Sequence, residues 1–402
     1  MARTPPSVDG GMARLSREHR VLLDCITCER WDSKSDLHRR SDRQDPIDWS
    51  VLVRLAEAHG VLPLVAKQLH AVASAPEHVQ RDLARAASQV AARNLQLTGE
   101  LISIARTFGS AGIDMLPVKG PVLAQYVYGD VGLRVFGDLD IVVRERDLSS
   151  ALELLALRGY DLPHRGMSRR NAAHAATFGH FSARRADIGL TVEVHPQLVD
   201  PRFGFRVRND DLFNRAEFIT IADQRMRTLS RQDLLLYLCI HGSKHAFSRI
   251  EWVVAIGILM QQGGFEFAGL LDSATRVGGA RRLLLGMLLA NRLCGAPLTD
   301  QARRAIEADK TVPFLATKVC DGLFAATAGT DSAAESIALR IGFHTRAFDR
   351  VTDRLRYVYR CVVEPSEVEF TAFDLPDRLT PLYTPLRLAR LAMRAIGGKK
   401  GR

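Results

Sequence analysis

The sequence predicts an α+β protein in which a small sheet with its own helices lies between two helical regions. Apolar residues recur at helical spacing over residues 48–112, short alternating or β-branched apolar runs follow over 113–198, and helical spacing returns from residue 231. These changes in the spacing of apolar residues predict three regions: an N-terminal helical region with a flexible tail (1–112), an α/β core (113–230) and a C-terminal helical region with a disordered tail (231–402).

The N-terminal region begins with a tail that contains proline and glycine, followed later by a polar stretch, 30–46, that is typical of a loop. Helical spacing then extends over 47–72 and 81–112, and Gly112 is well placed to end the second of these helices.

The core and the C-terminal region follow in order. In the core, the sequence predicts strands at 113–118, 138–144 and 188–198 and helices at 121–129 and 147–160. It also predicts a short hairpin over 217–223 and 225–230. The C-terminal region predicts helices from residue 231, with breaks at 363–370 and 374–386 and a disordered tail at 397–402.

The overall composition is that of a globular protein. Of the 402 residues, 47% are hydrophobic and 25% are charged, which is typical of soluble proteins. No stretch approaches the ~20 uncharged apolar residues that a membrane span needs. The N-terminus also lacks the apolar segment of a secretory signal. We therefore expect a cytoplasmic protein with no membrane partner.

Cysteine and charge patterns argue against a disulfide framework, a zinc or redox site and a nucleic-acid surface as the main features of the chain. The six cysteines are scattered, which favours reduced thiols over disulfides. Cys25 and Cys28 form a C-x-x-C, but their segment also has the spacing of an amphipathic helix and no second Cys/His pair follows at zinc-finger spacing. The net charge of +10 is spread in arginine doublets without interleaved aromatic residues. Nucleic acid is therefore a possible partner but not the favoured one.

Three carboxylates on two predicted strands indicate a metal site. Alternate residues of a strand face the same side, so Asp138 and Asp140 project together. By itself this D-x-D could mark only a turn and an exposed strand end. Glu193 and His195 share one face of the third strand, however, and Glu193 beside the aspartates completes a cluster suited to Mg²⁺ or Mn²⁺.

A phosphate-binding turn is predicted where the first strand meets the first core helix. Gly120 permits close backbone approach, and the start of the helix offers N–H groups and a positive dipole end. Lys119 can meet a phosphate as a point charge, although it could also be a surface lysine. Arg134 precedes the aspartate pair by four residues and could reach the same anion.

These motifs, taken in order, resemble a known family. Residues 116–160, 192–198 and 234–253 are similar to the uncharacterised nucleotidyltransferase family of bacterial genomes, within the DNA polymerase β-like superfamily. Segments 47–65 and 375–391 extend the resemblance over most of the chain from about residue 48. Some members of that family occur in peptide natural-product gene clusters.

The resemblance implies a nucleotidyltransferase-type small mixed sheet and an Mg²⁺- or Mn²⁺-dependent site. Asp138 and Asp140 would be catalytic metal ligands and Glu193 the third carboxylate. Lys119 and Gly120 would stand where the wider superfamily has a Gly-Ser pair for the triphosphate. The resemblance also predicts an acidic residue near position 255, where this chain has Ala255.

The segment HGSKH allows more than one interpretation. His241 and His245 have the i, i+4 spacing that can bind zinc, but no third ligand is evident. The resemblance implies instead that Lys244 and His245 line a nucleotide pocket. The alternative is a partly buried helix face. His195 either orients a ligand or is a satisfied strand histidine.

The leading functional hypothesis is an enzyme that moves a nucleotidyl group from an NTP, such as ATP, to an unknown acceptor. The acceptor could be a peptide or a small molecule, as in natural-product biosynthesis. The alternatives are a phosphoryl-transfer enzyme that modifies a peptide, and a catalytically inactive nucleotide- or RNA-binding protein of the same fold.

Overall fold

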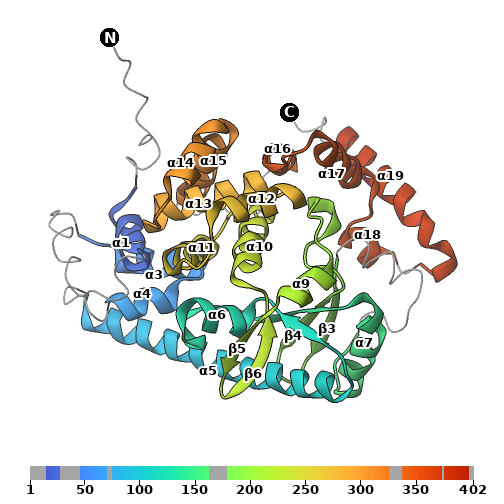
Figure 1. Cartoon of the computed structure of the whole chain (residues 1–402), viewed down its shortest axis with the longest axis horizontal. Helices are drawn as coiled ribbons and strands as arrows, with labels where there is room; N and C mark the ends of the chain where they lie inside the picture. Colours follow the sequence, from blue (N-terminus) through green and yellow to red (C-terminus); the bar gives the residue numbers. More distant parts are fainter. Residues whose placement is uncertain are drawn as a thin grey trace, which may run out of the picture.

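The computed structural model describes residues 15–27, 46–69, 75–162, 179–325, 337–373 and 375–397 (Figure 1). The predicted N-terminal tail, most of the predicted loop at 30–46, Cys28 and most of the predicted C-terminal tail lie outside these residues. Cys25 lies in helix α1 (Arg17–Ile26) and is buried.

A four-stranded mixed sheet forms the centre of the α/β core. Its strands are β1 (Met115–Pro117), β2 (Asp138–Val143), β3 (Phe181–Arg185) and β4 (Leu190–His195), in the spatial order β1-β2-β4-β3. The two central strands, β2 and β4, are parallel, and each outer strand is antiparallel to its neighbour. The predicted mixed sheet is therefore present. The predicted hairpin is also present, as β5 (Glu217–Ile221) and β6 (Gln224–Thr228).

Strand β3 was not predicted from the sequence. It forms the outer edge of the sheet and returns into β4 through a tight turn over residues 186–189. Of its five residues only Ala183 is buried, because one face of the strand is largely open to solvent. Its segment FSARR therefore lacks the apolar alternation by which a strand is recognised.

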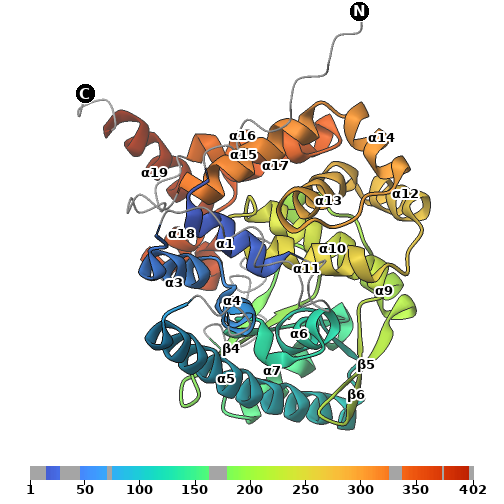
Figure 2. The same cartoon turned by 90° about the vertical axis from the view of Figure 1, so that its left-hand side faces the viewer.

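One face of the sheet is covered by helices α5 (Glu77–Ser110) and α7 (Leu148–Leu157). Leu139 and Ile141 of β2 join a buried cluster with Ile104 and Phe108 of α5. Figures 1 and 2 show the sheet between α5 on one side and helices α10, α11 and α13 on the other. The alternation in β2 that sends its apolar residues towards α5 therefore sends its aspartates towards these later helices.

The remaining helices lie in the core and in the two flanking regions. Before the sheet lie α3 (Trp49–Ala58) and α4 (Leu62–Leu69), and within the core lie α6 (Gly120–Tyr128) and α9 (Asn209–Arg215). After the hairpin come α10 (Arg231–Lys244), α11 (Ile250–Gln262), α12 (Phe267–Val277), α13 (Ala280–Cys294), α14 (Asp300–Ala308), α15 (Thr311–Ala325), α16 (Ile337–Ala347), α17 (Val351–Val363), α18 (Glu367–Ala372) and α19 (Tyr383–Gly397). The first predicted break begins where α17 ends, but α18 starts within it. The second contains a 3₁₀ helix at Asp377–Leu382 and the start of α19.

The larger hydrophobic core joins the flanking helical regions to each other and to the edge of the sheet. It contains Leu52 of α3, Leu116 of β1 and Leu285 of α13. The proposed boundaries after residues 112 and 230 stay predictions. No helix in the described part of the chain has the length and apolar character to cross a membrane.

A buried glutamate holds the C-terminal helices together. Glu369 is 1% exposed, and its carboxylate accepts hydrogen bonds from the backbone N and side-chain Oγ of Ser366, both at 2.7 Å. It also forms ion pairs with Arg387 and Arg390 of α19. Burial raises the pKa of Glu369, but the Ser366 hydrogen bonds and Arg390 outweigh burial and lower the pKa to about 2.

We expect this lowered pKa to make the C-terminal helices sensitive to acid. Because the folded-state pKa lies below the unfolded value, the stabilisation is complete above about pH 5 and is lost as the pH falls towards 2. Glu369→Gln should reduce the free energy of unfolding at pH 7 by about 1–3 kcal/mol. It should also flatten the dependence of stability on pH between 5 and 2. Denaturant unfolding at several pH values tests this, with the exposed Glu307→Gln as the control; identical pH profiles for the Glu369→Gln protein and wild type would contradict it.

Candidate active site

The acidic residues meet because β2 and β4 are adjacent and parallel. In their register Asp138 lies opposite Thr191, and Asp140 lies opposite Glu193. In β4, Thr191, Glu193 and His195 are half-buried while the alternating Leu190, Val192 and Val194 are fully buried. The polar residues of the two strands therefore share the sheet face that is turned away from α5.

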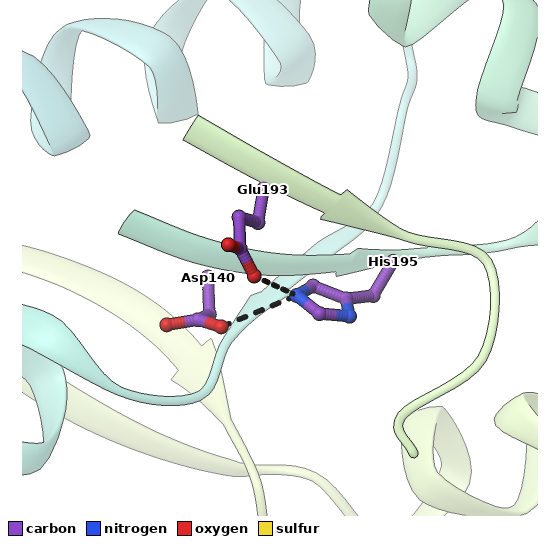
Figure 3. Close-up of side chains that lie close together, drawn as sticks. All are labelled: Asp140, Glu193 and His195. Atoms are coloured by element: carbon purple, nitrogen blue, oxygen red, sulfur yellow. Dashed lines mark hydrogen bonds and ion pairs between the residues drawn. The ribbon is translucent and has the colours of Figure 1, made fainter. Parts of the chain in front are cut away.

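Three of these side chains form a compact group that could hold a metal ion. The candidate ligand atoms of Asp140, Glu193 and His195 all lie within 4.8 Å of one another. His195 Nε2 is 3.2 Å from Asp140 Oδ1 and 3.4 Å from Glu193 Oε2, so the imidazole bridges the two strands (Figure 3). Asp138 lies outside this group of three but lines the same cavity.

Burial and neighbouring charges push the pKa values of the two aspartates in opposite directions. Burial would raise the pKa of Asp140, but Lys119 and His195 outweigh burial and hold that pKa well below its usual range. Burial, and then the charge of Asp140, raise the pKa of Asp138. Asp140 therefore carries a negative charge in the folded protein, and a second negative charge on Asp138 is costly without a further cation.

Lys119 supplies one cation directly to this cluster. Its Nζ atom lies 2.8 Å from Asp140 Oδ1, and its side chain is 13% exposed. Burial would lower the pKa of Lys119, but Asp140 is the main group that outweighs burial and raises it. The lysine is therefore a charged, partly enclosed residue rather than a surface one.

Gly120 follows Lys119 as the first residue of α6 and packs against β2. Its φ is +56°, and a Cβ at this position would lie 3.3 Å from the backbone oxygen of Asp138. A side chain is therefore disfavoured both by backbone conformation and by the close approach of the strand. Gly120 keeps the turn, and hence Lys119, close to the aspartates.

A cavity of about 560 Å³ lies over this face of the sheet. Every predicted site residue lines it except Gly120, which lies behind its wall. The sheet side contributes Lys119, Arg134, Asp138, Asp140, Glu193 and His195, and the loops and helices that face it contribute Asp200, Tyr237, His241, Lys244, His245, Arg249, Glu251 and Trp252. The two sets come from segments far apart in the sequence.

Several residues that line the cavity, among them His180 and Glu251, were not predicted as site residues from the sequence. His180 precedes β3 and places its Nε2 3.8 Å from Glu193 Oε1. The sequence did not single out His180 because the strand that follows it, β3, was not predicted. Glu251 stands four residues before Ala255, and so one helical turn from the position where an acidic residue was expected. Ala255 is buried, whereas Glu251 lines the cavity.

The HGSKH segment lies at the C-terminal end of α10 and contributes aromatic and basic groups. The rings of His241 and His245 are 4.9 Å apart, and the Trp252 ring lies 5.1 Å from His245. Burial lowers the pKa of His241 well below its usual value, so this imidazole is neutral. Burial also lowers the pKa of Lys244. The two histidines are not part of any three-ligand metal group among the described residues.

The glycine of this segment has a packing role. A Cβ on Gly242 would lie 2.3 Å from Cε1 of Phe247, which is fully buried and has a φ of +49°. The ring therefore occupies the space that any side chain at residue 242 would need.

We expect Gly242→Ala to destabilise the protein by about 3 kcal/mol, because the buried ring has no free space to move into. Gly322→Ala is the matched control, since a Cβ there meets no atom within 4 Å, and it should be neutral or slightly stabilising. Denaturant unfolding measures both. Equal changes in the free energy of unfolding for the two substitutions would contradict the packing of the Phe247 ring against residue 242.

The sheet and its site together define a nucleotidyltransferase-type fold: a small mixed sheet that presents carboxylates from two adjacent parallel strands beside a strand-to-helix turn. The chain belongs to the uncharacterised nucleotidyltransferase family, whose model matches residues 45–295. No curated protein and no solved structure matches the chain. The family match covers the sheet, the cavity and the helices from α3 to α13, and it leaves out α1 and the helices from α14 onwards.

Proposed function

We propose that the protein is a metal-dependent nucleotidyltransferase that moves a nucleotidyl group from an NTP to an acceptor. The observation that carries this proposal is the group formed by Asp140, Glu193 and His195 on the sheet face that bounds the cavity. Asp138 and Lys119 line the same cavity. Acidic side chains beside a basic strand-to-helix turn suit a triphosphate with its divalent cation.

The residues present fit such a cation. Asp140 is 2% exposed, and its Oδ2 atom has no hydrogen-bond partner among the described residues. A buried carboxylate oxygen without a partner is an available ligand. We assign Mg²⁺ or Mn²⁺ to Asp138, Asp140 and Glu193, with His195 beside them. When bound, the ion would neutralise phosphate charge and make the phosphorus easier to attack.

The protein's own groups would assist the transfer in defined ways. A bond forms between an acceptor atom and the α-phosphorus, and the bond from that phosphorus to the bridging oxygen breaks, so that pyrophosphate leaves. The acceptor proton would pass to a carboxylate, for which Glu193 is our candidate. Lys119, which caps the start of α6 and lines the cavity, would bind the phosphates. Lys244 and His245 would contact the nucleotide from the opposite wall.

The acceptor that we propose is a peptide or a small molecule in the cytoplasm. The phosphate-binding groups lie inside a cavity of about 560 Å³ instead of along an open basic surface, which supports a small acceptor over nucleic acid.

The test is NTP consumption in the presence of Mg²⁺, with wild type compared with the double variant Asp138→Ala plus Asp140→Ala. The proposal predicts turnover by wild type alone. Mass spectrometry of the product separates nucleotidyl from phosphoryl transfer, since the added masses differ. Equal NTP turnover by wild type and the double variant would contradict the proposal.

A further inference from the structure

Arg134 and Glu251 form a charged pair inside the cavity that the metal group does not use. They are 8% and 6% exposed. Arg134 Nη2 lies 3.8 Å from Glu251 Oε1, which is longer than a hydrogen bond. Glu251 Oε2 is buried without a hydrogen-bond partner among the described residues. A donor group and an acceptor group therefore stand side by side with unused hydrogen-bonding capacity.

The surrounding structure holds both members of the pair in place. Glu251 lies in the first turn of α11, and its backbone N–H donates to the carbonyl of His59 at 3.2 Å. Gly60 backs the carboxylate so closely that a Cβ there would lie 2.9 Å from Oε2. The carbonyl of Arg134 accepts a hydrogen bond of 2.7 Å from the buried side chain of Asn94. A pair fixed in this way is suited to recognising a ligand with little reorganisation.

Flat aromatic groups line the same cavity as this pair. Trp252 follows Glu251 in the chain and lines the same cavity. Its ring lies 5.1 Å from the ring of His245, with an angle of 35° between their planes. A ligand that satisfies these features is a planar ring with a polar edge, and an NTP carries such a ring in its base.

We infer that Arg134 and Glu251 recognise the base of the bound NTP, that Trp252 packs against its ring, and that the preferred base is guanine. The guanine edge presents O6 as an acceptor, which an arginine contacts, beside N1–H and N2–H donors, which a carboxylate accepts together. The inference rests on the proposed function. It assigns Arg134 to the base in place of the phosphate contact expected from the sequence.

Calorimetric binding of three probes tests this inference, each with Mg²⁺: non-hydrolysable GTP, non-hydrolysable ATP and inorganic tripolyphosphate. Wild type should bind the GTP analogue at least about tenfold more tightly than the ATP analogue, because a site built to pair polar groups rejects a ligand that lacks them. Glu251→Gln should weaken the GTP analogue at least about tenfold and leave tripolyphosphate within about twofold. Glu251→Asp, which keeps the charge, is the second variant, and the exposed Glu57→Gln is the control.

Three results would overturn the inference while leaving the proposed function intact. They are the absence of a GTP preference in wild type, an unchanged preference in the Glu251→Gln protein, and an equal loss of tripolyphosphate and GTP-analogue binding, which would place Glu251 at the phosphates. If wild type bound none of the three probes, the proposed function itself would fail, and the inference with it.

Discussion

Asp140→Asn should lower NTP turnover by at least about three orders of magnitude. Asp140 is the residue on which the site's charges converge: Lys119 and His195 both contact its Oδ1, and its Oδ2 is unpartnered among the described residues. Asparagine keeps the shape of the side chain but removes the negative charge that would hold a divalent cation. The measurement is pyrophosphate release from NTP in the presence of Mg²⁺.

The control for this substitution is Asp223→Asn in the turn between β5 and β6. Asp223 is exposed and has a φ of +60°, a conformation that asparagine also tolerates, so the control should leave turnover unchanged. Circular dichroism should show both variants folded. If the Asp140→Asn protein kept a tenth or more of wild-type turnover, Asp140 would not be a metal ligand in the reaction.

Lys119→Met should lower kcat/KM for the NTP by about two to three orders of magnitude. Methionine fills most of the volume of the lysine stem, so the main change is the loss of the ammonium group. That group lies 2.8 Å from Asp140 and at the start of α6, where we place the phosphates. Without it the triphosphate loses a point-charge contact.

A second measurement on this variant separates binding from packing. Its free energy of unfolding should fall by about 3–5 kcal/mol, because removing one partner of a buried ion pair leaves the charge of Asp140 without its nearest cation. The kcat/KM is therefore compared under conditions in which circular dichroism shows both proteins folded. The control is Lys318→Met, a lysine with a 61% exposed side chain in α15 that should leave kcat/KM unaltered. Near-normal kcat/KM for the Lys119→Met protein would show that Lys119 only neutralises Asp140.

The sheet face of the site was predictable because strand periodicity is a local property. The alternation of Asp138 with Leu139, and of Glu193 with Val192, was enough to place both acidic sets on one face. Residue spacing could not show that His195 lies between Asp140 and Glu193, because that contact depends on the register between two strands more than fifty residues apart. Strand β3 was missed for a related reason: an edge strand buries too little to show an apolar pattern.

The opposite wall of the cavity was predictable only in part. The HGSKH segment drew attention to Lys244 and His245, which do line the cavity. Glu251 had no local signal, since a single glutamate in the first turn of a helix is ordinary. Its importance comes from the packing of Gly60 against its carboxylate and from Arg134, which lies 117 positions earlier in the chain. Such contacts follow from the folded structure and not from residue spacing.

The measurement that tests the central claim most directly follows the labelled phosphorus of an NTP. Wild type is incubated with Mg²⁺, a small-molecule and peptide extract as the acceptor pool, and an NTP labelled at either the α- or the γ-phosphate. The account predicts that the α-label enters a product while the γ-label leaves as pyrophosphate, and that the protein with Asp138→Ala plus Asp140→Ala does neither. Transfer of the γ-label to the product, or equal transfer by the double variant, would contradict it.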